Sequence, residues 1–102
     1  MIIYNVTVSV EEAIKDEWLN WMRTEHIPEV MACGIFTKAQ INHVIEKIDS
    51  DNTFAIAYTC SSTKELHRYQ MKFAAKLQQK HSVMFGNKAV AFRTLMQVIE
   101  EF

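Results

Sequence analysis

The chain has 102 residues, a net charge of −1 and a hydrophobic fraction of 49%. This length predicts one domain, residues 1–102, with a single core, and the near-neutral charge gives no general attraction to nucleic acid or to an anionic membrane. No stretch approaches the roughly 20 apolar residues of a membrane-spanning helix, and no leader pattern is visible. The two cysteines have no metal or disulfide-framework spacing, which favours reduced thiols in a cytoplasmic protein.

The first third of the chain predicts a strand followed by an interrupted helix. Residues 2–9 alternate between apolar and polar side chains, as in a half-buried strand. From Glu11 onward the apolar residues follow helical spacing. Pro28 cannot donate to the carbonyl of Thr24, so we expect this helix to bend or break near residues 26–27 and to restart at the proline. Gly34 is expected to end it.

The remaining two thirds predict a hairpin, a long helix and a last strand. Residues 35–48 and 53–61 read as two strands joined by a polar turn at residues 49–52. Ser62 and Glu65 have capping-box spacing and open a helix over residues 63–85. The last strand is expected at residues 88–100, after the Gly86-Asn87 stop.

The predicted order βαββαβ favours an α+β protein with a ferredoxin-like fold, an antiparallel four-stranded sheet with both helices on one face. The other face is expected to be too apolar for water, so a second copy is predicted to cover it, and a monomer with an apolar face is the alternative. This open face is predicted to carry Ile3, Asn5, Thr7, Ala55, Ala57, Ala91, Arg93, Leu95 and Ile99.

Three segments carry a resemblance to a known family. The opening IIYNVTV, the EHIPEV segment and the closing AVAFRT resemble a family of short bacterial proteins described as a domain of unknown function. The order of elements also resembles the dimeric α+β-barrel superfamily, in which two ferredoxin-like subunits join their sheets. That superfamily includes cofactor-free monooxygenases, muconolactone isomerases, chlorite dismutases and haem-degrading enzymes. The resemblance implies a homodimer but no particular activity, because fold does not fix function.

A candidate site lies around the proline. Trp18, Met22 and His26 are spaced four residues apart, so they share one face of the first helix. His26 could act as a general acid or base, with aromatic side chains as walls for a flat apolar ligand. Equally, the tryptophans could be core residues and His26 could cap the interrupted turn. The predicted pocket is lined by Tyr4, Trp18, Trp21, His26, Phe36 and Phe92.

Two further residues stand out near the end of the chain. Arg93, placed on an apolar sheet face, needs either a carboxylate across a dimer or an anionic ligand, and the sequence favours the carboxylate. We include Arg93 among the candidate ligand-binding residues. His81, near the end of the second helix, has a sufficient structural role there through the helix dipole.

Several other site types are disfavoured. The four histidines have no metal-ligand spacing, so no metal site is expected. Haem degraders of this superfamily use an asparagine, a histidine and a tryptophan; Asn5 and His81 are present, but the second helix has no tryptophan. The third strand lacks the signature of RNA-recognition modules. The lysines and arginine at every fourth position of residues 64–80 favour a solvated helix face over a phosphate site.

The sequence therefore predicts a homodimeric α+β-barrel protein that binds a flat apolar or aromatic small molecule without a cofactor. If His26 is catalytic, the protein is an enzyme of the cofactor-free oxygenase or isomerase kind. A non-catalytic ligand-binding or protein-interaction module is the alternative, and the residues leave this choice open.

Overall fold

A computed structural model gives the fold and describes residues 1–45 and 52–102. Its four strands are β1 (Ile2–Val10), β2 (Lys38–His43), β3 (Thr53–Cys60) and β4 (Ala89–Gln97). The helical segment after β1 consists of η1 (Glu12–Ile14), α1 (Lys15–Trp21), η2 (Met22–His26) and α2 (Ile27–Ala32). The segment after β3 consists of α3 (Thr63–Tyr69), η3 (Gln70–Ala74), α4 (Ala75–Phe85) and η4 (Gly86–Lys88).

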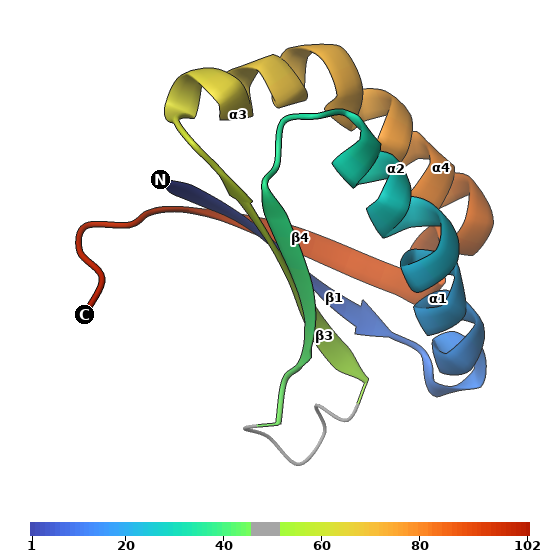
Figure 1. Cartoon of the computed structure of the whole chain (residues 1–102). Helices are drawn as coiled ribbons and strands as arrows, with labels where there is room; N and C mark the ends of the chain where they lie inside the picture. Colours follow the sequence, from blue (N-terminus) through green and yellow to red (C-terminus); the bar gives the residue numbers. More distant parts are fainter. Residues whose placement is uncertain (46–51) are drawn as a thin grey trace.

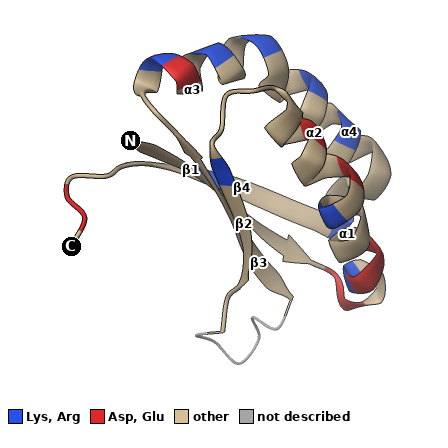
Figure 2. Ribbon diagram, in the orientation of Figure 1, with Lys and Arg blue, Asp and Glu red and all other residues tan. Residues whose placement is uncertain are grey.

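The sheet has the strand order β2-β3-β1-β4, and all its neighbouring strands are antiparallel. Both helical segments cover the same face of the sheet, and the C-terminal segment projects away from it (Figure 1). Charged residues gather on the helices, whereas the strands carry few of them (Figure 2). The predicted ferredoxin-like fold, with two helices on one face of an antiparallel four-stranded sheet, is confirmed.

The pairing register corrects the predicted open face at β4. Val6 pairs with Arg93 and Thr7 pairs with Phe92, and directly paired residues lie on the same side of a sheet. Val8, next to Val6 on this face, is buried under the helices. Arg93 is therefore on the helix-covered face together with Ala91 and Leu95, not on the open face. Ile99 lies beyond the end of β4.

The open face instead carries the other half of β4. Ile3, Asn5 and Thr7 lie there as predicted, with Ala55 and Ala57 of β3 beside them. The β4 residues on this face are Val90, Phe92, Thr94 and Met96. The predicted alternation in β4 is therefore one residue out of phase with the structure, and such a shift exchanges the two faces of a strand.

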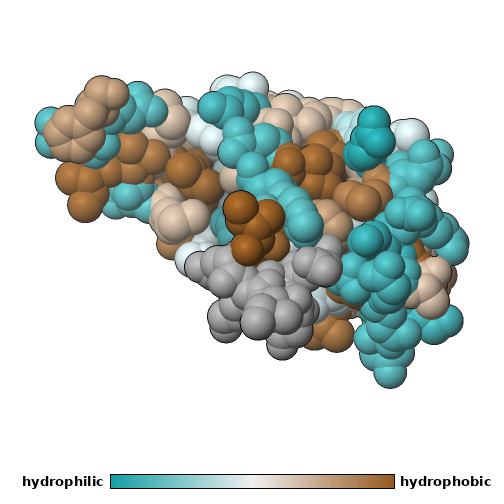
Figure 3. Space-filling view, turned by 90° about the horizontal axis from the view of Figure 1, so that it is seen from below, coloured by the Kyte–Doolittle hydropathy of each residue, from teal (hydrophilic) through white to brown (hydrophobic). Residues whose placement is uncertain are grey.

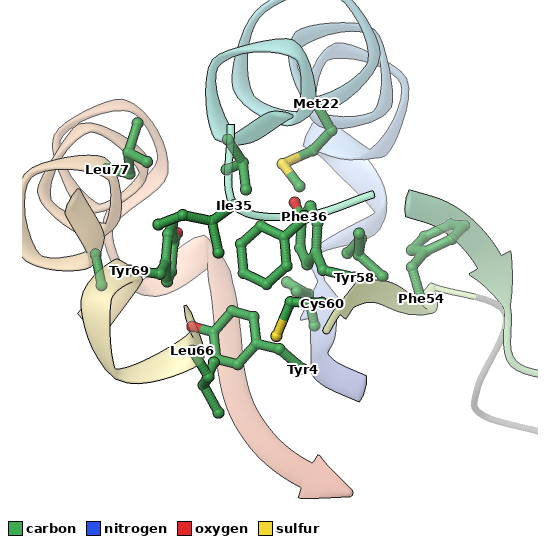
Figure 4. Close-up of a cluster of buried hydrophobic side chains, with 14 of the residues drawn as sticks. Tyr4, Met22, Ile35, Phe36, Phe54, Tyr58, Cys60, Leu66, Tyr69 and Leu77 are labelled. Carbon is green, nitrogen blue, oxygen red and sulfur yellow. The ribbon is translucent and has the colours of Figure 1, made fainter. Parts of the chain in front are cut away.

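The core is a sandwich of aromatic and aliphatic side chains between the sheet and the helices. The rings of Tyr4, Phe36, Tyr58 and Tyr69 pack against one another with centroids 4.8–6.0 Å apart (Figure 4). Trp18 is completely buried, with its ring 5.3 Å from that of Phe54. The aromatic side chains that the sequence places near the first helix are thus mainly structural.

The helical segment after β1 is interrupted before Pro28, as predicted, but by a π-helical turn rather than by a break, and α2 restarts with the proline in its first turn. Residues 22–26 form a π-helix, in which the amide of Ile27 donates to the carbonyl of Met22, five residues earlier. His26 and Ile27 keep right-handed helical angles. The wide turn separates the proline ring from the carbonyl four residues before it, so the helix can continue. The segment ends at Gly34, with a φ of 78°, as predicted.

The second helical segment begins and ends where the sequence predicts. The Ser62 hydroxyl accepts a hydrogen bond of 3.2 Å from the Glu65 amide, and Gly86 has a φ of 56°. A second π-helix, η3 (Gln70–Ala74), interrupts it, and no proline or glycine marks this turn in the sequence. Figure 1 shows the segment running across the sheet beside the first one.

The hairpin strands are shorter than predicted. β2 begins only at Lys38, because Ile35 and Phe36 turn into the core before the strand starts. Part of the predicted strand 35–48 and most of the predicted turn 49–52 lie outside the described residues. At the other end of the chain β4 stops at Gln97 rather than at residue 100.

Candidate functional site

A small cavity lined by both polar and apolar side chains lies between the sheet and the two helical segments. Its volume is about 30 Å³, which holds about two water molecules. It cannot enclose a flat aromatic ligand. The polar residues that line it are Tyr4, Tyr58 and Tyr69, His26 and His81, Gln78, and Arg93.

His26 is the last residue of the first π-helix, and its imidazole lies flat on the indole of Trp21. The two rings are stacked, with centroids 5.0 Å apart. The buried Nδ1 atom of His26 has no hydrogen-bond partner in the structure. Burial, with a smaller contribution from His81, lowers the pKa of His26 from 6.5 to about 4. His26 is therefore neutral near pH 7 and carries an unengaged ring nitrogen.

His81, on α4, faces His26 with ring centroids 6.0 Å apart. The indole Nε1–H of Trp18 donates to His81 Nε2 at 3.0 Å. Because an indole nitrogen can only donate, His81 Nε2 must be the unprotonated nitrogen of the ring. This bond selects the neutral tautomer with its proton on Nδ1. Burial also lowers the pKa of His81, so both histidines are uncharged.

Arg93 reaches the cavity from the helix-covered face of β4. Its Nε–H donates to the hydroxyl oxygen of Tyr4 at 2.9 Å. Arg93 is exposed in this chain and lies on the face opposite to the predicted one, so its predicted place on the open face was wrong. The bond to Tyr4 fixes one edge of the guanidinium and leaves the fork of its two terminal nitrogens directed elsewhere.

The tyrosines supply neutral hydroxyl groups to the same cavity. Burial raises the pKa values of Tyr58 and Tyr69 well above their ordinary range, and neighbouring tyrosines add to the shift. These phenols therefore keep their protons and act as donors. Tyr4 accepts from Arg93, so its own O–H remains available to donate.

The candidate residues predicted from sequence separate into three groups. Tyr4, His26 and Arg93 line the cavity, and Trp21 stacks on His26 outside it. Trp18 and Phe36 belong to the core. Phe92 was wrongly placed in the pocket, because it lies on the open face of the sheet and is 63% exposed.

Sequence reasoning missed four polar residues of the cavity lining: Tyr58, Tyr69, Gln78 and His81. Tyr69 and His81 lie on the inner stripe of the second helix, so the helical period could have pointed to them. Tyr58 follows Ile56 by two residues, so both lie on the inner face of β3. Their polar atoms meet those of His26 and Arg93 only through the packing of helix on sheet, which no local pattern reports.

Among residues 1–45 and 52–102, no three histidine, cysteine, aspartate or glutamate side chains are grouped so that they could share a metal ion. Within the same ranges, no helix has the length and apolar character needed to span a membrane.

Solved structures of other proteins share this fold. A dimeric ferredoxin-like protein from an uncultured marine organism superimposes with a TM-score of 0.75 at 8% identity, over 99% of this chain and 96% of that one. HapK from Hahella chejuensis has a TM-score of 0.72 at 8% identity, over 100% and 97% of the two chains. A protein from Shewanella loihica, provisionally described as a monooxygenase, has a TM-score of 0.56 at 13% identity, over 98% and 96%.

These likenesses concern the fold alone, because the sequence identities are low. No curated protein is significantly similar to the chain in sequence. A family model does match, and it covers residues 1–99. The chain therefore belongs to the family described as a domain of unknown function, DUF4286.

Proposed function

We propose that the protein is a small-molecule enzyme in which His26 removes a proton from its substrate. The observation that carries this proposal is the buried Nδ1 atom of the half-buried His26 imidazole, which has no hydrogen-bond partner in the protein. A buried polar atom without a protein partner costs free energy unless water or a ligand pairs with it. An unprotonated ring nitrogen in this position can accept a proton from a bound substrate.

The chemistry follows from the groups around His26. With its proton on Nε2, His26 would take a substrate C–H or O–H proton on Nδ1 and become an imidazolium. The released electron pair would move onto a substrate oxygen, where the neutral tyrosine hydroxyls can donate hydrogen bonds to the developing charge. Return of the proton at another atom completes an isomerisation. Cofactor-free oxygenation begins with the same deprotonation.

The volume of the cavity limits how the substrate binds. About 30 Å³ admits only a small reacting group. The rest of the molecule must remain outside, near the exposed part of β4 that carries Arg93. This replaces the flat aromatic ligand expected from the sequence, because Trp18 and Phe36 fill the core instead of lining a slot.

The same proposal includes a homodimer that joins the open faces of two sheets. Val90, Phe92 and Met96 on this face are 61%, 63% and 43% exposed. An apolar strand surface of this kind favours association. The similar protein from a marine organism is described as dimeric, which supports the assignment.

A reducing, cytoplasmic location is also proposed. Cys33 and Cys60 are both free thiols in the structure. Burial raises the pKa of each thiol, which keeps both protonated and slow to oxidise.

Hydrogen–deuterium exchange tests the proposed proton transfer. Methyl acetoacetate and acetoacetate carry acidic C–H groups, and NMR in D2O measures their exchange above the buffer background. The wild-type protein should accelerate exchange of at least one of them, and His26→Ala should lose that acceleration. His67→Ala is the matched control, because His67 is exposed on α3. Equal rates for wild type and His26→Ala would contradict the proposal.

The small cavity also favours a second candidate, a non-catalytic binding module. A pocket that holds about two water molecules can position one small group without catalysing any reaction. This candidate predicts saturable binding of a probe with no acceleration of exchange. The exchange experiment, combined with a binding titration, therefore separates the two functions.

A further inference from the structure

Among the residues that the structure describes, Arg93 has no acidic partner, and it lies at the edge of the candidate site. The ion pairs among the described residues are Lys15–Glu12, Arg68–Glu65 and Lys80–Glu29, and none of them includes Arg93. The sequence favours a carboxylate of a second copy as the partner of Arg93. That expectation depends on Arg93 lying on the open face, where the dimer would form. Arg93 lies on the opposite face, so that reason for a protein partner no longer holds.

The guanidinium is nevertheless held in one orientation. Tyr4 accepts from Nε at 2.9 Å, and the Tyr4 ring packs on Tyr69 and Phe36 in the core. No other hydrogen bond from Arg93 is made within the described part of the chain. The terminal nitrogens, which together carry four N–H groups, are thus free on a fixed side chain. That fork matches two oxygens of one planar group.

The charge around the site indicates one negative charge on the occupant. His26 and His81 are neutral near pH 7, since burial lowers the pKa values of both. Lys80 is already paired with Glu29, at 2.6 Å. Arg93 therefore contributes the one uncompensated positive charge of the described cavity lining. A carboxylate carries one negative charge, whereas a phosphate group carries roughly one and a half to two near pH 7, so part of its charge would remain unpaired.

We infer that Arg93 binds the carboxylate of a small carboxylic acid whose reacting group enters the cavity beside His26. Tyr4 is the positioning residue, because it orients the guanidinium. This inference rests on the proposed function for the identity of the site, and it adds the class of substrate. A carboxylate held at the mouth would leave the adjacent carbon or carbonyl group to face the histidine.

An NMR titration tests the inference independently of turnover. The chain has two tryptophans, so its two indole N–H resonances can be assigned with Trp21→Phe. Trp21 stacks on His26 and reports on the site, whereas the Trp18 indole is bound to His81 in the core. The probes are acetoacetate, its neutral methyl ester and inorganic phosphate.

Acetoacetate should shift the Trp21 resonance to saturation, and the methyl ester should bind at least about tenfold more weakly, since a charged hydrogen bond is lost. Arg93→Gln should weaken acetoacetate binding by a similar factor, and Arg93→Lys should restore part of it by keeping the charge. Arg68→Gln is the matched control, because Arg68 pairs with Glu65 on the exposed side of α3. The control should bind acetoacetate as the wild type does.

Four results would overturn the inference. They are no saturable response to acetoacetate, equal affinity for acid and ester, unchanged acetoacetate affinity in Arg93→Gln, and tighter binding of phosphate than of acetoacetate. The outcomes also distinguish this inference from the proposed function. Acetoacetate binding without accelerated exchange would contradict only the proposed enzymatic function. Accelerated exchange of the ester that is the same in wild type and Arg93→Gln would contradict only the inferred binding of a carboxylate by Arg93.

Discussion

The two faces of the sheet differ in what they do with polar groups. On the helix-covered face, hydroxyl, imidazole and guanidinium groups meet in a small cavity inside an aromatic core. On the open face, small polar residues such as Asn5 and Thr7 lie among apolar ones, and Asn5 and Thr7 bond to each other at 3.1 Å. The first arrangement is costly unless its polar atoms are used. The second is typical of a surface that associates.

The two faces can be compared directly along β4, because side chains on both of its faces are exposed. Arg93 and Leu95 on one face, and Phe92 and Met96 on the other, are all exposed. Hydrophobic side chains continue over the surface toward the projecting C-terminal segment (Figure 3). A single strand thus borders both the candidate site and the candidate dimer surface, so its substitutions can separate the two roles.

The largest effect is expected from a pair of truncations on opposite faces. Trp18→Ala removes a completely buried ring and its bond to His81, which should lower the free energy of unfolding by about 3–5 kcal/mol. Phe92→Ala, on the open face, should change the free energy of unfolding of the monomer by less than about 1 kcal/mol. Urea denaturation of dilute protein measures both. Similar losses would mean that Phe92 is part of the monomer's core.

A second pair of substitutions separates the faces by their effect on self-association. Ala57→Asp places a carboxylate in the centre of the open face, and it should weaken the dimer at least about a hundredfold, or roughly 2.7 kcal/mol, since an unpaired charge would be buried. Leu95→Asp lies on the helix-covered face and should leave the dimer intact. Sedimentation over a concentration series measures both. A dimer that dissociates only with Leu95→Asp would reverse the assignment of the interface.

How far the sequence predicts this molecule depends on which interactions set each feature. The elements, their order and the caps at Ser62, Gly34 and Gly86 follow from local rules, because the residues that decide them are neighbours in the chain. The assignment of the β4 residues to the two faces of the sheet did not follow from such local rules. Apolar residues occur on both of its faces, so alternation gave no clear choice between Arg93 and Phe92.

The site was predicted only in part for the same reason. His26 stood out because it precedes the one proline, and Tyr4 and Arg93 were identified as well. Their meeting with His81 depends on two π-helical turns and on the packing of both helices over the sheet. The Trp18–His81 bond joins residues 63 positions apart. Periodicity can place each of them on an inner face but cannot pair them.

The smallest expected effect concerns the cavity face and its dependence on pH. In the folded protein the pKa of His26 is lowered from 6.5 to about 4. Between these values the unfolded chain binds the proton and the folded chain does not, so stability is complete above pH 6.5 and falls as the pH decreases toward 4. His81 adds to the loss in the same direction. For His26 the loss should be on the order of 2 kcal/mol, after allowance for its partial exposure.

Urea denaturation from pH 7 to pH 4.5 measures this loss, and comparison with two variants assigns it. His26→Gln should flatten the dependence, because its side chain does not titrate. His67→Gln, on the exposed side of α3, should keep the wild-type dependence. If His26→Gln and the wild type lose stability in parallel, the imidazole of His26 is not the buried neutral base that the cavity indicates. In that case the cavity on the helix-covered face would have no group suited to proton transfer, and the two faces would no longer differ in chemical role.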